Sequence, residues 1–278
     1  MAFSKLIPGL RIALVQMLWC PDKTKNLATA VKEIHKAKQR GAQLVALPEC
    51  YKYEHNIDWE EVPSGEACRA LSEAAAEAGV CVVGGTLPER DGSALYNTCT
   101  VWDSDGSLLA RHRKMHLYDI DIPNKVTHRE SELVSAGDQI TTFVFNGVKI
   151  GLGICFDICF PEMVELMAQD GCSLLIFPSD FHMVTGSRYW EALGRTRAFE
   201  NQLWVALVGP ARDPDTEYKS WGHSMLVDPW GTIKAELDEN VGTILEDIDF
   251  NVVEEVRKQW PVRAQRRTDV YNTVRKSS

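Results

Sequence analysis

Residues 148–162 read VKIGLGICFDICFPE: an apolar run ends in a glycine, an isoleucine and a cysteine, and a proline follows six residues after that cysteine. The run Val148 to Leu152 is rich in β-forming residues, and Pro161 suits a first helical turn because its φ is fixed. A strand therefore gives way to a helix, with a sharp turn at Cys155. Such a turn exposes the side chain, and nearby helix N–H dipoles favour thiolate over thiol. We interpret Cys155 as a nucleophile; the alternative is a buried structural cysteine.

On either side of this turn, short apolar runs alternate with amphipathic stretches. Before it the pattern predicts strands at 12–15, 44–47, 81–85 and 97–102, and helices at 24–40 and 64–78. After it the pattern predicts strands at 174–177 and 203–208 around a helix at 189–201. Three later runs, at 224–227, 232–235 and 243–248, suggest antiparallel strands. The order predicts an α/β protein with a mixed sheet, which alone does not identify a function.

Length and composition favour one large domain that handles small molecules. The chain has 278 residues, 45% of them hydrophobic, and no low-complexity linker or internal repeat divides it. Its formal charge of −9 argues against nucleic acid and anionic membranes as partners. No uncharged apolar stretch reaches the ~18 residues that a membrane span needs.

The eight cysteines indicate reduced thiols rather than a disulfide framework, because the chain is large and several cysteines lie in apolar strand-like runs such as 81–83. The N-terminal residues lack the long apolar segment of a secretory signal. We therefore expect a cytoplasmic protein, with a short organellar address left open.

Two charged residues, like Cys155, follow predicted strands. Glu49 follows the predicted strand at 44–47, so its carboxylate emerges at a strand end, where open α/β sheets place their ligand sites. Lys114 follows a strand and hairpin-like region. Read singly, each residue is a solvated surface charge by default.

Together with Cys155, these residues resemble the Glu-Lys-Cys triad of the nitrilase, or carbon–nitrogen hydrolase, superfamily, and the resemblance covers nearly the whole chain. The segments that carry it are Leu47-Pro48-Glu49, 112–117, 153–157, 195–201, Gly222-His223-Ser224 and 228–231. Within the superfamily, segments 117–123, 130–131 and 135–138 are most similar to the omega-amidase branch, which hydrolyses monoamides of small dicarboxylic 2-oxo acids.

The resemblance implies a four-layer αββα sandwich with mixed sheets that forms a homodimer. Residues 8–250 would form the hydrolase domain, and 251–278 a C-terminal extension of helix and tail at the dimer interface. The implied reaction is hydrolysis of a small carboxylic monoamide through a thioester acyl-enzyme, with release of ammonia. Neither a cofactor nor a metal is implied.

The resemblance also assigns roles to side chains. Glu49 would be the general base. Lys114 and the backbone N–H of Phe156 would stabilise the oxyanion, a type of donor worth roughly 3–4 kcal/mol each. Glu130 would orient Lys114, although a surface glutamate is the alternative. The expected substrate-binding residues are Phe156, Tyr118, Phe181 and Arg188.

One position departs from the family pattern. Relatives commonly have an arginine four residues after the nucleophile, a candidate for holding the substrate carboxylate, and this chain has Cys159 there. A thiol replaces neither the charge nor the bidentate geometry of a guanidinium. Arg188 or Lys125 could supply a compensating cation, or each could be a solvated charge.

Other functions stay open at this point. A papain-like enzyme would pair the cysteine with His116 or His223, and a metal site would use Cys155, Cys159 and a histidine. The same superfamily also includes amidases and carbamoylases acting on other small amides. A binding protein that retains the amidase fold without turnover is the non-catalytic alternative.

Overall fold

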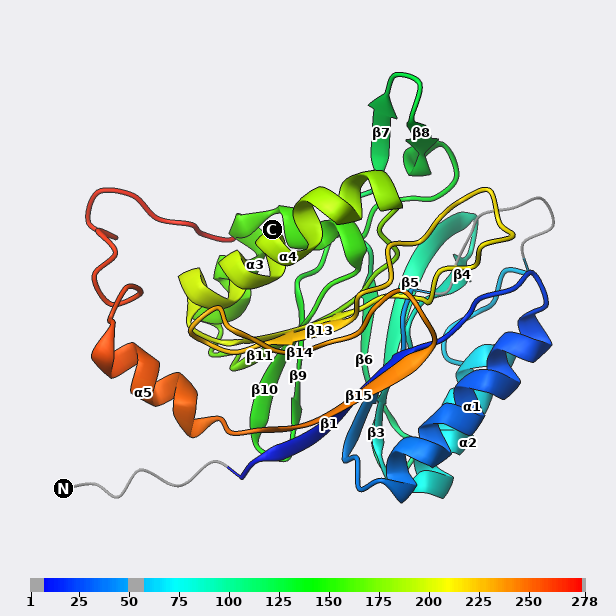
Figure 1. Ribbon diagram of the computed structural model, residues 1–278, viewed down its shortest axis with the longest axis horizontal. Helices are drawn as coiled ribbons and strands as arrows, with labels where there is room; N and C mark the ends of the chain where they lie inside the picture. The colour runs from blue at the N-terminus through cyan, green and yellow to red at the C-terminus, as the bar shows by residue number, and fades with distance from the viewer. Residues whose placement is uncertain (1–7, 50–57, 277–278) are drawn as a thin grey trace.

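The computed structural model describes residues 8–49 and 58–276, and the two large β-sheets within them stack face to face (Figure 1). The first sheet has seven strands in the order β15 (Gly242–Ile248), β1 (Leu10–Gln16), β2 (Leu44–Ala46), β3 (Cys81–Val83), β5 (Ala94–Trp102) and β4 (Leu87–Asp91), with β6 (Leu108–Arg113) also on β5. The second has six, in the order β14 (Ile233–Glu236), β13 (Met225–Val227), β12 (Trp204–Val208), β11 (Leu174–Pro178), β10 (Val148–Leu152) and β9 (Thr141–Phe145).

Each sheet contains three neighbouring parallel strands flanked by antiparallel ones. In the first sheet these are β1, β2 and β3, and in the second β10, β11 and β12. The later strands β13, β14 and β15 all pair antiparallel, as the short C-terminal runs predicted. Parallel strands end at one edge, so the residues that follow β2, β10 and β11 emerge on one side of each sheet.

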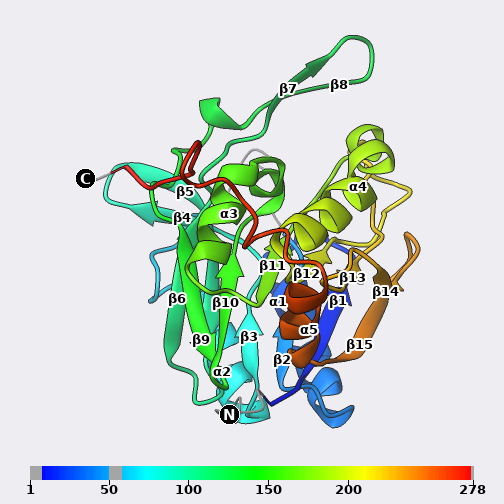
Figure 2. The ribbon, with the colours of Figure 1, turned by 90° about the vertical axis from the view of Figure 1, so that its left-hand side faces the viewer.

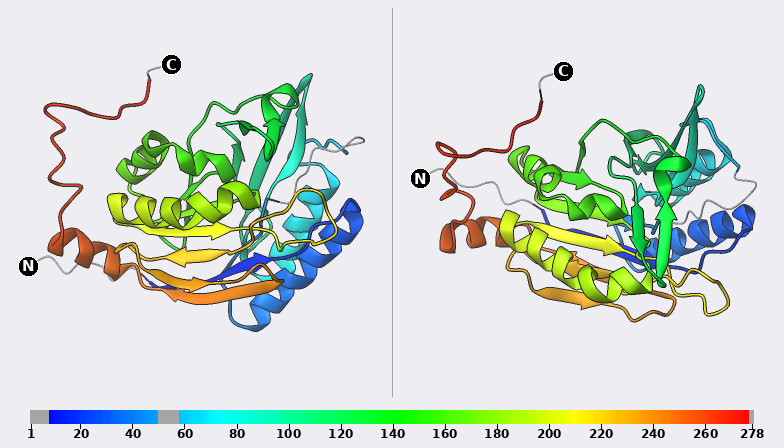
Figure 3. Two further views of the ribbon diagram at one scale, coloured as in Figure 1. Left: turned by 45° about the horizontal axis from the view of Figure 1, so that its top comes forward. Right: turned by 90° about the horizontal axis from the view of Figure 1, so that it is seen from above.

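Helices cover both outer faces, which gives the four layers visible in Figure 3. Helices α1 (Lys23–Gln39) and α2 (Glu66–Ala78) pack on the first sheet around a small apolar cluster. Helices α3 (Pro161–Gln169) and α4 (Met183–Asn201) lie on the second sheet. A larger cluster fills the space between the sheets and extends beneath α3 and α4. The predicted αββα sandwich is confirmed.

Two segments lie outside the sandwich. The hairpin of β7 (Asp119–Ile122) and β8 (Val126–Arg129) projects from one end of the molecule, and the 3₁₀ turn Glu130–Glu132 follows it (Figure 1). After α5 (Asn251–Gln259), residues 260–276 cross α3 (Figure 2). Arg263 donates to the carbonyl of Ala168 at 3.0 Å, and Arg275 bonds the Asp170 carboxylate. None of the helices in the described residues combines the length and apolar character required to cross a bilayer.

The predicted elements match the structure to within three residues at each end, except that α4 begins at Met183 rather than at residue 189. The strands β4 and β9 were not predicted. His182 caps this helix by accepting from the Val184 N–H at 3.1 Å. Gly186, which weakens a helical pattern in the sequence, is there for packing: a Cβ at this position would come within 2.4 Å of Trp221.

Candidate active site

Four buried polar side chains meet at the edge of the first sheet, and we call them the charged cluster: Glu49, Asn97, Lys114 and Glu130. The topology explains the meeting. Glu49 follows the parallel strand β2 and Lys114 follows β6, whereas β5 runs the opposite way and so places Asn97, near its start, at the same edge. Glu130 begins the 3₁₀ turn after the projecting hairpin.

The Lys114 ammonium lies between the two carboxylates. Its Nζ is 3.2 Å from Glu49 Oε1 and 2.9 Å from Glu130 Oε2. Backbone N–H groups complete the arrangement: that of Asp180 donates to Glu49 Oε2 at 2.9 Å and that of Tyr118 to Glu130 Oε2 at 2.7 Å. Although burial opposes ionisation, Lys114 and the Tyr118 N–H hold the pKa of Glu130 below its ordinary value.

Cys155 stands opposite the charged cluster, at the sharp turn that the sequence predicted. Its φ of +46° lies in the left-handed region that few residues other than glycine adopt, and the 3₁₀ turn Cys155–Cys159 separates β10 from α3. The side chain is 5% exposed. Strained backbone of this kind is common at functional sites.

The expectation that helix dipoles favour the thiolate is wrong. Burial, followed by the Glu49 carboxylate, raises the pKa of Cys155 well above its ordinary value, and Lys114 opposes this only in part. The helix α3 begins six residues later, at Pro161, rather than at the cysteine itself. Cys155 is therefore a thiol at rest and needs a base to become a nucleophile.

A second buried network of hydrogen bonds, centred on Asp157, stabilises the turn at Cys155. Asp157 accepts from His112 Nε2 at 3.0 Å, from the Ile154 N–H at 2.9 Å, and from the backbone N–H and Nδ1 of His116 at 2.9 and 2.7 Å. Burial opposes the charge, but hydrogen bonds from the two histidines hold the pKa of Asp157 well below its usual range. The turn is thus tied to the segment that carries Lys114.

Aromatic rings form one side of the site, and we call them the aromatic wall: His116, Tyr118, Phe156 and Phe160. Tyr118 meets Phe156 edge-on at 5.4 Å between ring centroids, and Phe156 meets Phe160 at 5.3 Å. His116 stacks on Phe160 at 3.6 Å. Burial raises the pKa of Tyr118, so its hydroxyl stays protonated. Two predicted substrate-binding residues, Phe156 and Tyr118, therefore contact each other next to Cys155.

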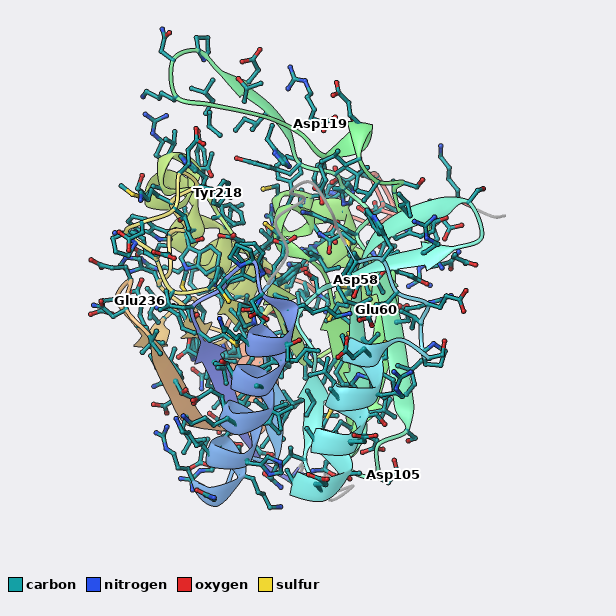
Figure 4. All side chains as sticks on the ribbon, turned by 90° about the vertical axis from the view of Figure 1, so that its right-hand side faces the viewer. Asp58, Glu60, Asp105, Asp119, Tyr218 and Glu236 are labelled. Atoms are coloured by element: carbon teal, nitrogen blue, oxygen red, sulfur yellow. The ribbon has the colours of Figure 1, made fainter. Side chains whose placement is uncertain are left out.

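A loop closes the other side. Tyr218, labelled in Figure 4, lies on the loop before β13 and donates from its hydroxyl to the Asp180 carbonyl at 2.8 Å. Burial, with the Asp180 and Cys155 groups nearby, raises the pKa of Tyr218 well above its ordinary value. Phe181, next along the chain from Asp180, is buried and packs edge-on against Trp190 at 5.3 Å.

Both predicted cations are exposed side chains on elements other than those that carry the charged cluster. Arg188 is exposed and lines a cavity of about 600 Å³ with Trp221, Trp230 and Glu236 on the α4 side of the second sheet. Lys125 is exposed at the tip of the β7–β8 hairpin. Their roles in substrate binding stay predictions.

Cys159 is half-buried, and burial raises the pKa of its thiol to about 11. The nearby Arg197 is already engaged: it donates to the carbonyls of Ile158 and Cys159 at 2.8 and 3.1 Å and pairs with Glu200. The Arg197 guanidinium therefore stabilises the turn that follows Cys155. Because these partners occupy it, it does not replace the missing arginine as a bidentate partner for a substrate carboxylate.

The competing pairings find little support in the described part of the chain. His116 is bonded to Asp157, and His223 stacks on Trp221 with its Nδ1 3.7 Å from Glu236. The one group of three metal-capable side chains among the described residues is Asp58, Glu60 and Glu66, near the start of α2 (Figure 4).

That acidic group already has a cation. The Lys23 ammonium is 2.6 Å from Asp58 and 3.2 Å from Glu66 and also bonds Glu60. Of the eight cysteines, the seven that lie in the described residues are unpaired, and Cys50 falls outside them.

Sequence reasoning missed Asn97. Its Nδ2 donates to Glu49 Oε1 at 2.8 Å and to Glu130 Oε1 at 3.2 Å. The available signal was a carboxamide at the start of a predicted apolar strand, where a buried polar group needs a partner. That partner could be named only once β5 was known to run antiparallel to β3.

A buried cysteine at a strained turn, opposite a carboxylate–ammonium–carboxylate group on an αββα sandwich, defines the class of cysteine-dependent hydrolases of carbon–nitrogen bonds. The chain belongs to the carbon–nitrogen hydrolase family, whose sequence profile matches residues 11–258.

Relatives of known name extend over nearly the full length. The chain is 45% identical to omega-amidase NIT2 of Xenopus tropicalis over 273 residues, which is 96% of this chain and 99% of that protein. It is 42% identical to omega-amidase NIT2 of Homo sapiens, covering 94% and 96%.

Solved structures agree with the fold. Saccharomyces cerevisiae Nit3, a member of branch 10 of the nitrilase superfamily, superposes with a TM-score of 0.86 at 36% identity, covering 96% of this chain and all of that one. A Nesterenkonia amidase variant with the acetamide moiety of fluoroacetamide added covalently at its active-site cysteine has a TM-score of 0.76 at 25% identity, covering 96% and 98%.

Proposed function

We propose that this protein is an omega-amidase-like enzyme that hydrolyses small carboxylic monoamides to the free acid and ammonia. The observation that carries the proposal is the Lys114 ammonium held 3.2 Å from Glu49 beside the Cys155 thiol, all three buried. Isolated charges are expensive to bury, and this arrangement supplies a base, a cation and a nucleophile in one place. The names of the curated relatives support the same reaction.

The first half of the reaction forms a thioester. Glu49 takes the proton of Cys155 as the sulfur attacks the amide carbon, and the carbonyl oxygen becomes an oxyanion. Lys114 and the Phe156 N–H stabilise that charge. When the C–N bond breaks, the proton held by Glu49 passes to the nitrogen and ammonia leaves. Burial and the Glu49 carboxylate raise the pKa of the Cys155 thiol, which is why the scheme assigns its proton to Glu49.

The second half uses the same base. Glu49 removes a proton from water, the resulting hydroxide attacks the thioester carbon, and the C–S bond breaks. The sulfur regains its proton from Glu49 and the free acid departs. Glu130 stays ionised and orients Lys114 throughout, consistent with its lowered pKa.

We assign substrate contacts to the aromatic wall through Tyr118 and Phe156, and to Phe181 on the opposite loop. Arg188, exposed on α4, is the proposed distal cation, and we expect it to change KM by less than about twofold. The half-buried Cys159 adds no positive charge to the site. We therefore propose that an acid end of the substrate is held more weakly here than by a family arginine.

The test is a panel of small amides, nitriles and short peptides at matched concentrations, with ammonia or amine release as the readout. Monoamides should give the highest kcat/KM. A nitrile or peptide preference would replace the proposed substrate class, and binding without turnover of any amide would favour the non-catalytic alternative. An N-carbamoyl compound in the same panel distinguishes a carbamoylase.

The proposed active form is a cytoplasmic homodimer, with residues 8–250 as the hydrolase domain and 251–278 as an extension at the interface. Apolar side chains left exposed on the extension support this: Trp260, Val270, Tyr271 and Val274 are each more than half exposed. The unpaired state of the seven described cysteines is compatible with a reducing compartment. Sedimentation of the full chain and of a chain ending at residue 259 tests the dimer.

A further inference from the structure

Asn97 is the member of the charged cluster that the proposed reaction does not use. It is 1% exposed, and its single Nδ2 donates to Glu49 and to Glu130, the proposed base and the proposed partner of Lys114. Both bonds go to Oε1 atoms that Lys114 Nζ also contacts at 3.2 Å. The amide and the ammonium therefore hold the same two oxygens from different directions.

These contacts constrain Glu49, the proposed base. With Asn97 and Lys114 on Oε1 and the Asp180 N–H on Oε2, three donors set the orientation of the Glu49 carboxylate. Two carboxylates share one ammonium in this cluster. The Asn97 carboxamide gives each of them a further donor without adding a charge or a titratable proton.

We propose that Asn97 is a positioning residue that bridges Glu49 and Glu130 and fixes the orientation of both carboxylates, so that Glu49 alone receives the Cys155 proton. The inference rests on the proposed function for its choice of base. Asn97 touches neither sulfur nor substrate in this scheme and acts through the two glutamates.

Several other titratable groups face the cluster. Tyr118 precedes β7, His128 is on β8, Cys155 follows β10, Asp180 follows β11 and Tyr218 precedes β13. Burial lowers the pKa of His128, and Cys155 is a protonated thiol. A change at residue 97 therefore shows most directly on the two glutamates, in the acid limb of the rate profile.

The experiment compares Asn97→Asp and Asn97→Leu with the wild type. Asn97→Asp adds a third carboxylate beside one ammonium and should move the acid limb of kcat/KM up by about one pH unit or more, since a nearby like charge raises a carboxyl pKa. Asn97→Leu keeps the volume without the donor, and should lower kcat by about 100-fold through misplacement of the base, with KM within about threefold.

Asn201 supplies a matched control. It is also 1% exposed, and its Nδ2 also donates to two acceptors, the Arg197 carbonyl at 3.1 Å and Glu200 at 3.4 Å, at the end of α4. Asn201→Asp and Asn201→Leu should lower the melting temperature by a similar amount and leave the acid limb where it is. An equal shift in the Asn201→Asp variant would mean a general effect of buried charge and would overturn the assignment.

The rate of Cys155 alkylation by fluoroacetamide, followed by intact mass across pH, gives a readout that does not need turnover. In Asn97→Asp this rate should shift in pH as kcat/KM does. Unchanged pH profiles in Asn97→Asp and Asn97→Leu, corrected for folded protein, would reduce Asn97 to a structural role. If Asn97→Leu does not fold, Asn97→Ser, which is smaller and polar, takes its place under the same criteria.

The outcomes separate the two proposals. A wild type that is alkylated at Cys155 but turns over no amide contradicts the proposed function, while the alkylation profiles still decide the role of Asn97. A wild type that turns over amides with the same pH profile as the Asn97 variants contradicts only this inference.

Discussion

The charged cluster and the aromatic wall both border Cys155 and are built differently. Three of the four cluster residues come from strands or strand ends of the first sheet, and the members hold one another through hydrogen bonds of 2.8 to 3.2 Å. The wall comes from loops and the 3₁₀ turn, and its members meet through ring contacts of 3.6 to 5.4 Å.

From this difference we expect the charged cluster to determine the reaction rate and the aromatic wall to determine which substrates are accepted. A group fixed by three directional donors has one productive geometry, so any replacement there should affect the rate. Rings on loops can be exchanged with modest loss, and the family departure at Cys159 falls next to this wall. We expect large effects from the cluster side and from the nucleophile, and small, substrate-dependent effects from the wall side.

Removing the nucleophile should give the largest effect. Cys155→Ala should lower kcat by at least ~1000-fold while leaving the melting temperature within a few degrees, because alanine fits the turn but forms no thioester. Ammonia release and thermal unfolding of the same sample check both parts. Cys155→Ser is the companion variant, and retained turnover in either would refute covalent catalysis by this residue.

Replacing the base comes next. Glu49→Gln keeps the shape and removes proton uptake, so kcat/KM should fall by about 10²- to 10⁴-fold. Single-turnover formation of the acyl-enzyme should slow by a similar factor. Glu130→Gln, at the other side of Lys114, should be less severe; a larger loss at Glu130 than at Glu49 would exchange their roles.

The network behind the turn should govern stability at acid pH. The pKa of Asp157 is lower in the folded chain than the ~3.9 of an unfolded aspartate. Its contribution is therefore complete above that unfolded value and is lost as pH falls through the folded value. Asp157→Asn should lower the free energy of unfolding by about 3 kcal/mol at pH 7.

Chemical denaturation at several pH values measures this difference. The gap between wild type and Asp157→Asn should narrow as pH falls below about 4, because Asp157 then takes up a proton in the unfolded wild-type chain while it stays ionised in the folded chain. A constant gap at every pH would show that the variant acts through packing rather than charge.

On the wall side, Cys159→Arg should improve kcat/KM for 2-oxoglutaramate more than for an uncharged amide of similar size. A charged hydrogen bond contributes roughly 1.5–3 kcal/mol, so the selective gain should be about tenfold or more. Equal changes for both substrates would rule out binding of the substrate carboxylate by an arginine at position 159. Efficient turnover of 2-oxoglutaramate by the wild type, with no gain in the variant, would mean that another group binds the substrate carboxylate.

The smallest effect is expected from Arg188→Ala. The exposed side chain lines a cavity on the α4 side of the second sheet, apart from the charged cluster. KM for an acidic amide should change less than about twofold, as for most surface substitutions. A several-fold increase confined to acidic substrates would instead place Arg188 at the distal end of the site and sharpen the recognition side of the comparison.

Local patterns predicted the parts of the site that depend on neighbours in sequence. Glu49 and Lys114 follow strands, and Cys155 stands between β10 and the helix opened by Pro161. The stacking of two sheets came only from the family resemblance, since alternation alone fits several folds. The protonated state of Cys155 could not be predicted because burial and the Glu49 carboxylate reach it from the other sheet.

The role proposed for Asn97 could not be predicted from local sequence patterns either. Its strand was predicted, but its function depends on the antiparallel orientation of β5, which no local pattern encodes. The N-terminus of α4 was missed because Gly186 reads as a helix breaker until its contact with Trp221 is known. In each case a tertiary neighbour decided what the residue does.

The pairing of β1 with β15 has a consequence for how the chain is made. Arg11 and Asp247 bond across this pair although 236 residues separate them, and the Gln16 side chain, fully buried at the end of β1, donates to the carbonyls of Asp238 and Asn240. At ~5–20 residues per second of synthesis, β1 waits roughly 12–47 s for these partners.

During that interval the strand beside β2 has an open edge, and the Gln16 carboxamide has no permanent acceptor. Unpaired strand edges invite association between nascent chains. The ribosome-bound protein is therefore most vulnerable to aggregation just before β15 emerges, well after every residue of the charged cluster and the nucleophile has been synthesised.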